Sequence, residues 1–183
     1  MIRATNLHKR PVIDVDAGTR LGELSDLVLD PPRQRLVGLV VTPYQTSFSS
    51  GRQALLPASR LHGVRPDAIT VRGAGELVFA MWHLPDLPRL SLLLGRTVAS
   101  YSGTVLGVLD DVLIDEENGR IGGYPLRAAH FLGTLERWLA GESADRRWDY
   151  VRADADLRID NTLIAVPDDA VVRGRVEATA LTT

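Results

Sequence analysis

GTVLGVLDDVLIDEENGRIGGY, residues 103–124, has a counterpart in the same chain: GTRLGELSDLVLDPPRQRLVGL, residues 18–39. The two stretches align without a gap at an offset of 85 residues (107 − 22). A fixed period of this length is too long for a solenoid unit and suits one small domain. We therefore predict a tandem repeat of two compact domains. The identical pairs are Gly22 with Gly107, Asp26 with Asp111, Asp30 with Asp115, Arg35 with Arg120 and Gly38 with Gly123.

The length of 183 residues is compatible with two small domains. Pro85 and Pro88 mark a linker, so we predict a first domain over residues 1–84, a linker over 85–90 and a second domain over 91–183. Hydrophobic residues make up 45% of the chain and charged residues 24%, which is ordinary for a globular protein and unlike a disordered one. Each predicted domain is small, so we expect the two to support each other or a partner chain to support both.

Charge and cysteine content narrow the function classes. The formal net charge is −2 and the sequence pI is about 6.1, so no overall basic field is available to hold nucleic acid. The absence of cysteine excludes disulfides, thiolate metal sites and cysteine nucleophiles. The first residues carry no apolar run typical of a signal peptide, and no window reaches the length of a membrane span. We expect a soluble, cytoplasmic protein without a cofactor.

The repeated stretch predicts a β-hairpin in each copy. Residues 21–30 alternate with period two, the prolines at 31–32 break the pattern, and residues 36–42 supply a returning strand. In the second copy the turn contains Asn118 and Gly119, a strong hairpin signal because both residues accept positive φ. Further short apolar runs are separated by turn signals. We predict an all-β protein made of two small antiparallel β-barrels.

The second copy departs from the first after its hairpin. Matching Pro57 with Pro167 gives an offset of 110 (167 − 57), which indicates about 25 extra residues (110 − 85) in an insertion near residues 130–156. Within it, residues 130–139 predict a short amphipathic helix. This helix either covers its own barrel or presents an apolar patch to a partner, and both alternatives stay open. The apolar residues at helical spacing are Phe131, Leu135, Trp138 and Leu139.

The two copies share one sequence pattern: a short strand, a turn with glycine, Leu-Gly-x-Leu-x-Asp-x-x-x-Asp, and an apolar strand carrying glycine, closed later by an apolar residue and proline. This pattern resembles that of the PRC-barrel family. The resemblance implies a β-barrel that acts as a binding or adaptor module, because no catalytic residue set is shared across the family. It is carried by Leu21, Gly22, Leu24, Asp26, Asp30, Gly38 and Pro57 in copy one, and by Leu106, Gly107, Leu109, Asp111, Asp115, Gly123 and Pro167 in copy two.

The acidic residues of the second hairpin form the strongest candidate for a ligand-binding or catalytic cluster. Carboxylates such as those between Asp111 and Glu117 could ligate a hard cation, although the spacing lacks the pattern of an EF-hand loop. The favoured interpretation is structural: Asp111 and Asp115, like Asp26 and Asp30, accept hydrogen bonds from turn amides or pair with arginines. Whether this acidic turn binds a cation stays open.

No catalytic site is predicted. The histidines at positions 8, 62, 83 and 130 are scattered and do not form a zinc motif. The chain lacks the Gly-x-Ser-x-Gly elbow of serine hydrolases, a Walker A loop and a dinucleotide fingerprint. We therefore expect no catalytic, cofactor-binding or metal-binding residues, and a protein that is not an enzyme.

A second candidate surface combines arginines with aromatic residues. Arg146, Arg147 and Trp148, followed by Tyr150 and Arg152, could stack bases and contact phosphates. Acidic residues occupy the same segment, so a salt-bridged, solvated loop is favoured. The sequence thus predicts an interaction module that binds a protein partner or self-associates. The alternative is an RNA- or ribosome-associated assembly factor, by analogy with a ribosome-maturation relative of the family.

Overall fold

A computed structural model describes residues 1–44, 53–65, 67–72, 87–127 and 149–173. The chain forms two compact units, and the division does not follow the linear order of the two copies. Unit 1 contains Met1–Leu93 together with Val112–Gly122. Unit 2 contains Leu94–Asp111 and Gly123–Thr183. The tip of the second hairpin therefore belongs to the unit built mainly from the first copy.

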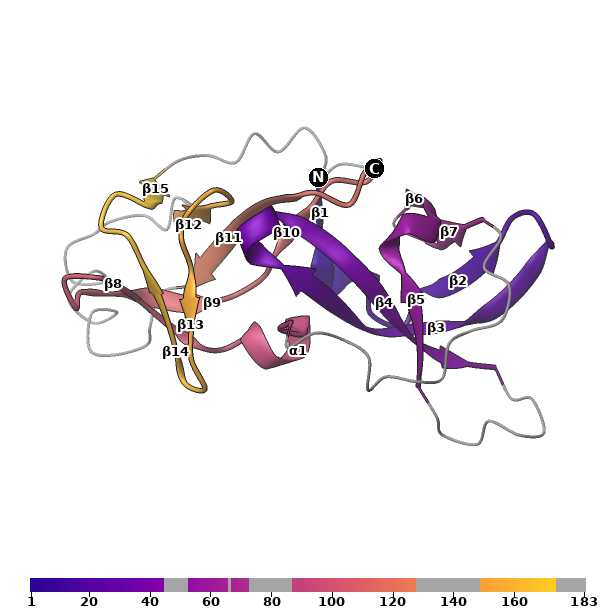
Figure 1. Ribbon diagram of the computed structural model, residues 1–183, viewed down its shortest axis with the longest axis horizontal. Helices are drawn as coiled ribbons and strands as arrows, with labels where there is room; N and C mark the ends of the chain where they lie inside the picture. Colours follow the sequence, from indigo (N-terminus) through magenta and orange to yellow (C-terminus); the bar gives the residue numbers. More distant parts are fainter. Residues whose placement is uncertain (45–52, 66, 73–86, 128–148, 174–183) are drawn as a thin grey trace, which may run out of the picture. The chain divides into compact units, whose positions relative to one another are not determined.

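Unit 1 is organised around a bent six-stranded sheet with the order β5-β4-β3-β2-β7-β6 (Figure 1). The neighbouring strands are antiparallel except for β2 and β7, which run parallel and join the first strand of the copy to a late one. The predicted antiparallel barrel did not include this pair. The strands are β2 (Pro11–Asp14), β3 (Thr19–Asp30), β4 (Arg35–Pro43), β5 (Ala54–Pro57), β6 (Leu61–Val64) and β7 (Ile69–Val71).

The predicted hairpin of copy one is confirmed as β3, β4 and the 3-10 turn η2 (Pro31–Arg33) between them. The register shifts between Leu24 and Asp26, so Ser25 forms a bulge that interrupts the strict alternation of the two faces. Its hydroxyl donates to the Val40 carbonyl oxygen over 3.0 Å. Beyond this bulge the strand is buried on both faces, from Leu27 to Asp30. A fully buried strand end explains why this stretch is so apolar.

Further short segments belong to unit 1, among them the 3-10 turn η3 (Ala58–Arg60) between β5 and β6. Strand β1 (Ile2–Arg3) pairs antiparallel with β10 (Leu113–Ile114), which is the outgoing arm of the second hairpin tip. The one-turn helix α1 (Leu90–Leu93) follows an isolated bridge between Val28 and Arg89. The 3-10 turn η1 (Ala4–Leu7) directly follows β1. In unit 1 each hairpin is thus paired with the segment that opens the other copy.

Unit 2 holds the strands of the second copy other than β10. Strand β8 pairs antiparallel with β9 and parallel with β14, and β11 pairs with both β9 and β12. Strands β13 and β15 pair with β14 and β12, respectively. The strands are β8 (Thr97–Ser100), β9 (Val105–Leu109), β11 (Ile121–Arg127), β12 (Asp149–Arg152), β13 (Arg158–Ile159), β14 (Leu163–Val166) and β15 (Val171–Arg173), of which β11 begins in unit 1.

Strand register corrects the predicted insertion. Gly38 pairs with Pro57, and its repeat counterpart Gly123 pairs with Arg152. Pro57 therefore corresponds to Arg152, and matching it with Pro167 was wrong. The paired residues are 19 positions apart in copy one (57 − 38) and 29 apart in copy two (152 − 123), so the second copy carries ten extra residues here rather than about 25. Pro167 instead follows β14, because Val98 pairs with Ile164 just as Val12 pairs with Ile69.

The all-β prediction is confirmed. Among the described residues the only α-helical segment is the single turn α1, and no helix there is long and apolar enough to cross a bilayer. The predicted amphipathic helix over 130–139 lies outside the described residues. The core side chains are aliphatic with one tyrosine, and the largest fully buried ones include Leu7, Leu24, Leu27, Leu39, Ile69 and Ile114 in unit 1 and Leu109, Tyr124 and Ile164 in unit 2.

Candidate functional site

The hairpin turn of copy one is organised by a buried carboxylate. The Asp30 side chain is only 3% exposed, and its Oδ1 accepts a hydrogen bond from the Arg33 amide over 3.3 Å. Its Oδ2 lies 3.1 Å from Nη1 of Arg33 and 3.6 Å from Nε of Arg35. Asp30 therefore caps the turn η2 and holds two arginines at the same time. This is the structural role that was predicted for it.

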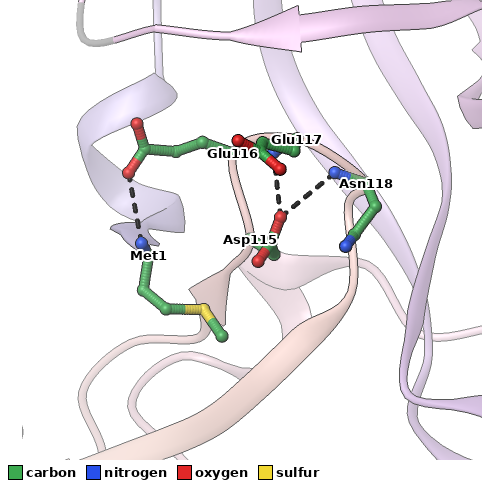
Figure 2. Close-up of polar contacts among 5 residues, drawn as sticks. All are labelled: Met1, Asp115, Glu116, Glu117 and Asn118. Atoms are coloured by element: carbon green, nitrogen blue, oxygen red, sulfur yellow. Dashed lines mark hydrogen bonds and ion pairs between the residues drawn. The ribbon is translucent and has the colours of Figure 1, made fainter.

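Asp115, the repeat counterpart of Asp30, caps the second turn in a different way. Its Oδ1 accepts hydrogen bonds from the amides of Glu117 and Asn118 over 2.9 and 3.1 Å (Figure 2). Glu116 on the same turn pairs with the α-amino group of Met1, 3.2 Å away. Two of the acidic side chains in the cluster therefore have structural partners within unit 1.

The conformation of this turn differs from the one expected for Asn-Gly. Gly119 has a φ of 70°, whereas Asn118 is not among the residues with positive φ. Gln34, the repeat counterpart of Gly119, also adopts the left-handed conformation, with a φ of 52°. Each turn thus has one residue in the left-handed conformation, at the equivalent position, and each begins with an aspartate cap. The hairpin prediction is confirmed, but the reason given for it applies to Gly119 alone.

The two turns meet through symmetric hydrogen bonds within unit 1. The Leu36 amide donates to the Gly119 carbonyl oxygen, and the Ile121 amide donates to the Gln34 carbonyl oxygen, each over 2.9 Å. If every residue is replaced by its counterpart in the other copy, 85 residues away, the first bond becomes the second and the second becomes the first. The bonds flank an antiparallel bridge between Arg35 and Arg120. The hairpin tips are therefore related by a local two-fold axis that passes between these arginines.

The first aspartate of the repeated motif fastens the opening segment of the other copy. Oδ2 of Asp26 accepts a 2.5 Å hydrogen bond from Oγ of Ser91, and Oδ1 accepts one from the Ser91 amide over 3.1 Å. Ser91 lies in α1, so the strand carboxylate fixes this single helical turn. A sequence stretch with one turn of helix carries no periodic signal, and this partner was not predicted. The counterpart Asp111 is fully buried.

The motif glycine that follows leucine, Gly22 in copy one and Gly107 in copy two, lies where neighbouring backbone leaves no room for a Cβ atom. A Cβ at Gly22 would lie 2.3 Å from the Thr42 carbonyl oxygen, and one at Gly107 would lie 2.7 Å from the Arg127 carbonyl oxygen. Both distances are shorter than real Cβ contacts, and the obstructing atoms belong to backbone that cannot rotate away. The same glycine therefore has the same purpose in both copies.

Substituting Asp30 with asparagine tests the electrostatic part of the first turn. Burial by itself raises the pKa of Asp30, but hydrogen bonds from Arg33 and the charges of Arg33 and Arg35 outweigh it, and the net pKa is lowered. A lowered folded-state pKa adds stability above the unfolded pKa of about 3.9, and this stability is lost as the pH falls through the folded-state pKa. We expect Asp30→Asn to lower the free energy of unfolding by about 2 kcal/mol at neutral pH.

The measurement is urea unfolding of wild type and variant over a range of pH. The difference between them should shrink to near zero at a pH well below the unfolded pKa of about 3.9, where the wild-type carboxyl is protonated too. Asp154→Asn is the matched control, since that carboxylate is 64% exposed and pairs with Arg152 at the surface. A difference for Asp30→Asn that stays constant with pH would contradict the ionic role of Asp30.

Carboxylates in unit 2 also act as caps. Asp168 accepts hydrogen bonds from Oγ and the amide of Ser102 over 2.5 and 3.2 Å, and these bonds lower its pKa. Asp160 accepts hydrogen bonds from the amides of Thr162 and Leu163, which lower its pKa as well. The aspartates next to turn residues were a signal for such caps, but the partner of Asp168 lies 66 residues away and could not be found from the sequence.

No group of three or more metal-ligating side chains comes together in the described part of the chain. The proposal that the Asp111–Glu117 turn holds a cation has no support from this geometry, and Asp110 pairs with Arg127 over 3.4 Å instead.

The predicted partner-binding side chains lie outside the described residues, because residues 128–148 include all of them. Those side chains are Phe131, Leu135, Trp138, Leu139, Arg146, Arg147 and Trp148.

Two residues that flank this segment are described. Tyr150 and Arg152 lie in strand β12 rather than in the predicted loop. Arg152 contacts two carboxylates, Asp154 at 3.2 Å and Asp169 at 3.5 Å. This arrangement agrees with the salt-bridged interpretation of the basic segment and offers little free positive charge at Arg152.

Together these features define a class of protein, a small β-barrel domain that occurs twice in one chain. In each copy an aspartate caps the hairpin turn and a glycine allows two strands to approach closely. The family model for the PRC-barrel domain matches residues 1–77 and again residues 86–172. The chain belongs to the PRC-barrel family, with two domains in tandem. A search of curated proteins found no match to the chain.

Proposed function

We propose that this tandem PRC-barrel protein is a non-enzymatic interaction module, whose partner is another protein or a second copy of the same chain. Its docking surface is the segment between β11 and β12. The polar side chains of the described turns support a non-catalytic role, because carboxylates such as Asp26, Asp30 and Asp115 are engaged in capping and fastening contacts.

The observation that carries the proposal is the uneven length of one hairpin connection. The connection between β4 and β5 in copy one and that between β11 and β12 in copy two are otherwise equivalent, but the second is ten residues longer. In copy one this connection is polar and rich in serine. In copy two it contains the apolar positions 131, 135, 138 and 139. Binding residues concentrate on loops held by a rigid scaffold.

The scaffold can hold such a connection firmly at both ends. Tyr124 pairs with Val151, and Pro125 pairs with Tyr150, in the antiparallel ladder of β11 and β12. Tyr124 and Val151 are both 1% exposed. A segment that starts and ends on a buried ladder loses less freedom on binding than a free tail does, which favours affinity.

The test compares wild type with a Leu135→Glu and Trp138→Glu double variant, using purified protein. Sedimentation velocity measures self-association, and cross-linking in lysate followed by reconstitution with the purified candidate measures binding to a partner. We expect association in the wild type and at least a tenfold loss in the double variant, because two apolar side chains of the proposed docking surface are replaced by charges.

Leu92→Glu is the matched control, since Leu92 is an exposed leucine (57%) in α1 and is not part of the segment. It should leave association unchanged. Equal association of the wild type and the double variant, with both folded, would contradict the proposal that this segment is the docking surface.

A further inference from the structure

We propose that the paired hairpin tips of unit 1 form a binding site for a phosphate group, held between Arg35 and Arg120. The residues of this site are not part of the docking segment, and the proposal does not depend on that segment. The inference rests on where the two copies bring like charges together, on which charges are already neutralised, and on the exposure of both arginines.

The strand geometry sets the two arginines side by side. The hydrogen bonds from Leu36 to Gly119 and from Ile121 to Gln34 flank the bridge, so Arg35 and Arg120 form a non-hydrogen-bonded antiparallel pair. In such a pair the Cα atoms are about 4.5 Å apart and the side chains leave the same face. Both arginines are exposed. Their guanidinium groups can therefore reach one ligand from neighbouring positions.

Like charges directly opposite one another destabilise a sheet. An opposite charge at such a position would stabilise the strand pair, yet here the repeat places arginine against arginine on the local two-fold axis. A bound anion would relieve this repulsion, and a phosphate group suits the site because two guanidinium groups can each donate paired hydrogen bonds to its oxygens.

The neighbouring acidic groups already have partners of their own. Oδ2 of Asp30 is shared between Arg33 and Arg35, so one carboxylate faces two guanidinium groups. On the opposite turn, Asp115 accepts amide hydrogen bonds and Glu116 pairs with the amino group of Met1.

Arg120 differs from Arg35 in its partners. Within the described part of the chain the Arg120 side chain has no ion pair, whereas the equivalent Arg35 has Asp30. The exposed Glu117 is the remaining carboxylate of the second turn, and it makes no ion pair with a described residue. Of the two arginines at the bridge, Arg35 thus shares one carboxylate with Arg33, whereas Arg120 keeps a guanidinium group that has no ion pair within the described residues and can contact a ligand.

The test is titration of the isotope-labelled full chain with inorganic phosphate, followed by amide NMR at constant ionic strength. We expect saturable shifts centred on residues 33–36 and 119–121. Arg35→Gln and Arg120→Gln should each weaken binding about tenfold, because each removes one charge-assisted contact. Arg120→Gln is the cleaner variant, since it removes no ion pair within the described residues.

Arg20→Gln is the matched control for net charge, because Arg20 is an exposed arginine of β3 that pairs with Ile13 away from the turns. It should leave phosphate binding unchanged. Absence of saturable shifts, equal shifts with chloride, or equal weakening by Arg20→Gln would overturn the proposal. Competition by a short single-stranded RNA that is lost in Arg120→Gln would place the phosphate in a polymer. Competition only by small phosphorylated compounds would place it in a free ligand, at the same site.

Discussion

Gly22→Ala is expected to lower the free energy of unfolding by about 3 kcal/mol, because an added methyl group would overlap backbone that cannot move aside. The Cβ would lie 2.3 Å from the Thr42 carbonyl oxygen and 2.8 Å from the Thr42 carbonyl carbon and the Pro43 Cα. These atoms belong to β4, the hairpin partner of β3. Relief requires the two longest strands of unit 1 to separate locally, which breaks part of their ladder.

Gly18→Ala is the matched control. Gly18 lies in the turn before β3, with a φ of 63° and no atom within 4 Å of an added Cβ. Its substitution should cost about 1 kcal/mol, from the backbone conformation alone. Chemical unfolding at equilibrium measures both variants. Equal losses for the two glycines would contradict the close-packing role of Gly22, which is not among the glycines with positive φ.

Ile114→Ala is expected to have a similarly large effect, about 3 kcal/mol, through loss of buried contacts. Ile114 is fully buried in β10 and pairs with Ile2 of β1. Although Ile114 belongs to the second copy, it lies in unit 1. The substitution should therefore weaken the unit that contains the first copy.

Val105→Ala is the control for Ile114→Ala, since Val105 is a 58% exposed residue of β9 in the same repeat. Its effect should stay within about 0.5 kcal/mol. Urea unfolding followed by circular dichroism measures both. A loss for Ile114→Ala no larger than that for Val105→Ala would contradict the placement of β10 in the core of unit 1.

The hairpins could be predicted because their signals are local. Period-two alternation, the prolines at 31–32 and Gly119 each act within a few residues, and the aspartate caps lie next to the turns they serve. The repeat itself made the hairpin prediction stronger, because two independent turn sequences occupied the same position.

The exchange of segments between the copies could not be predicted from the same signals. Residues 2–7 form one short strand and one 3-10 turn, which are too brief to show a period. Their pairing with Leu113 and Ile114 joins positions more than 100 residues apart in sequence. The fastening of α1 by Asp26 is equally non-local, so the motif aspartate could be recognised as a cap but not assigned its partner.

The error in the insertion has a simple cause. An apolar residue followed by proline ends β5 at Pro57, and the same pair of residue types occurs where Pro167 follows β14. Such a pair marks the end of a strand without saying which strand ends. Only the register of β12 on β11 shows that Arg152 is the true counterpart of Pro57. The candidate docking residues at 131–148 fall in the connection that this register defines.

The most direct test of the central claim, that the second hairpin tip is part of unit 1, is native-state hydrogen exchange of the full chain with and without Ile114→Ala. If the tip is shared in this way, exchange should accelerate at residues 2–7 and at the Leu36 amide, which donates to Gly119. The amides of β12, β14 and β15 should keep their wild-type rates. Acceleration confined to residues 94–111 and 123–173, with residues 2–7 and Leu36 unchanged, would contradict the account.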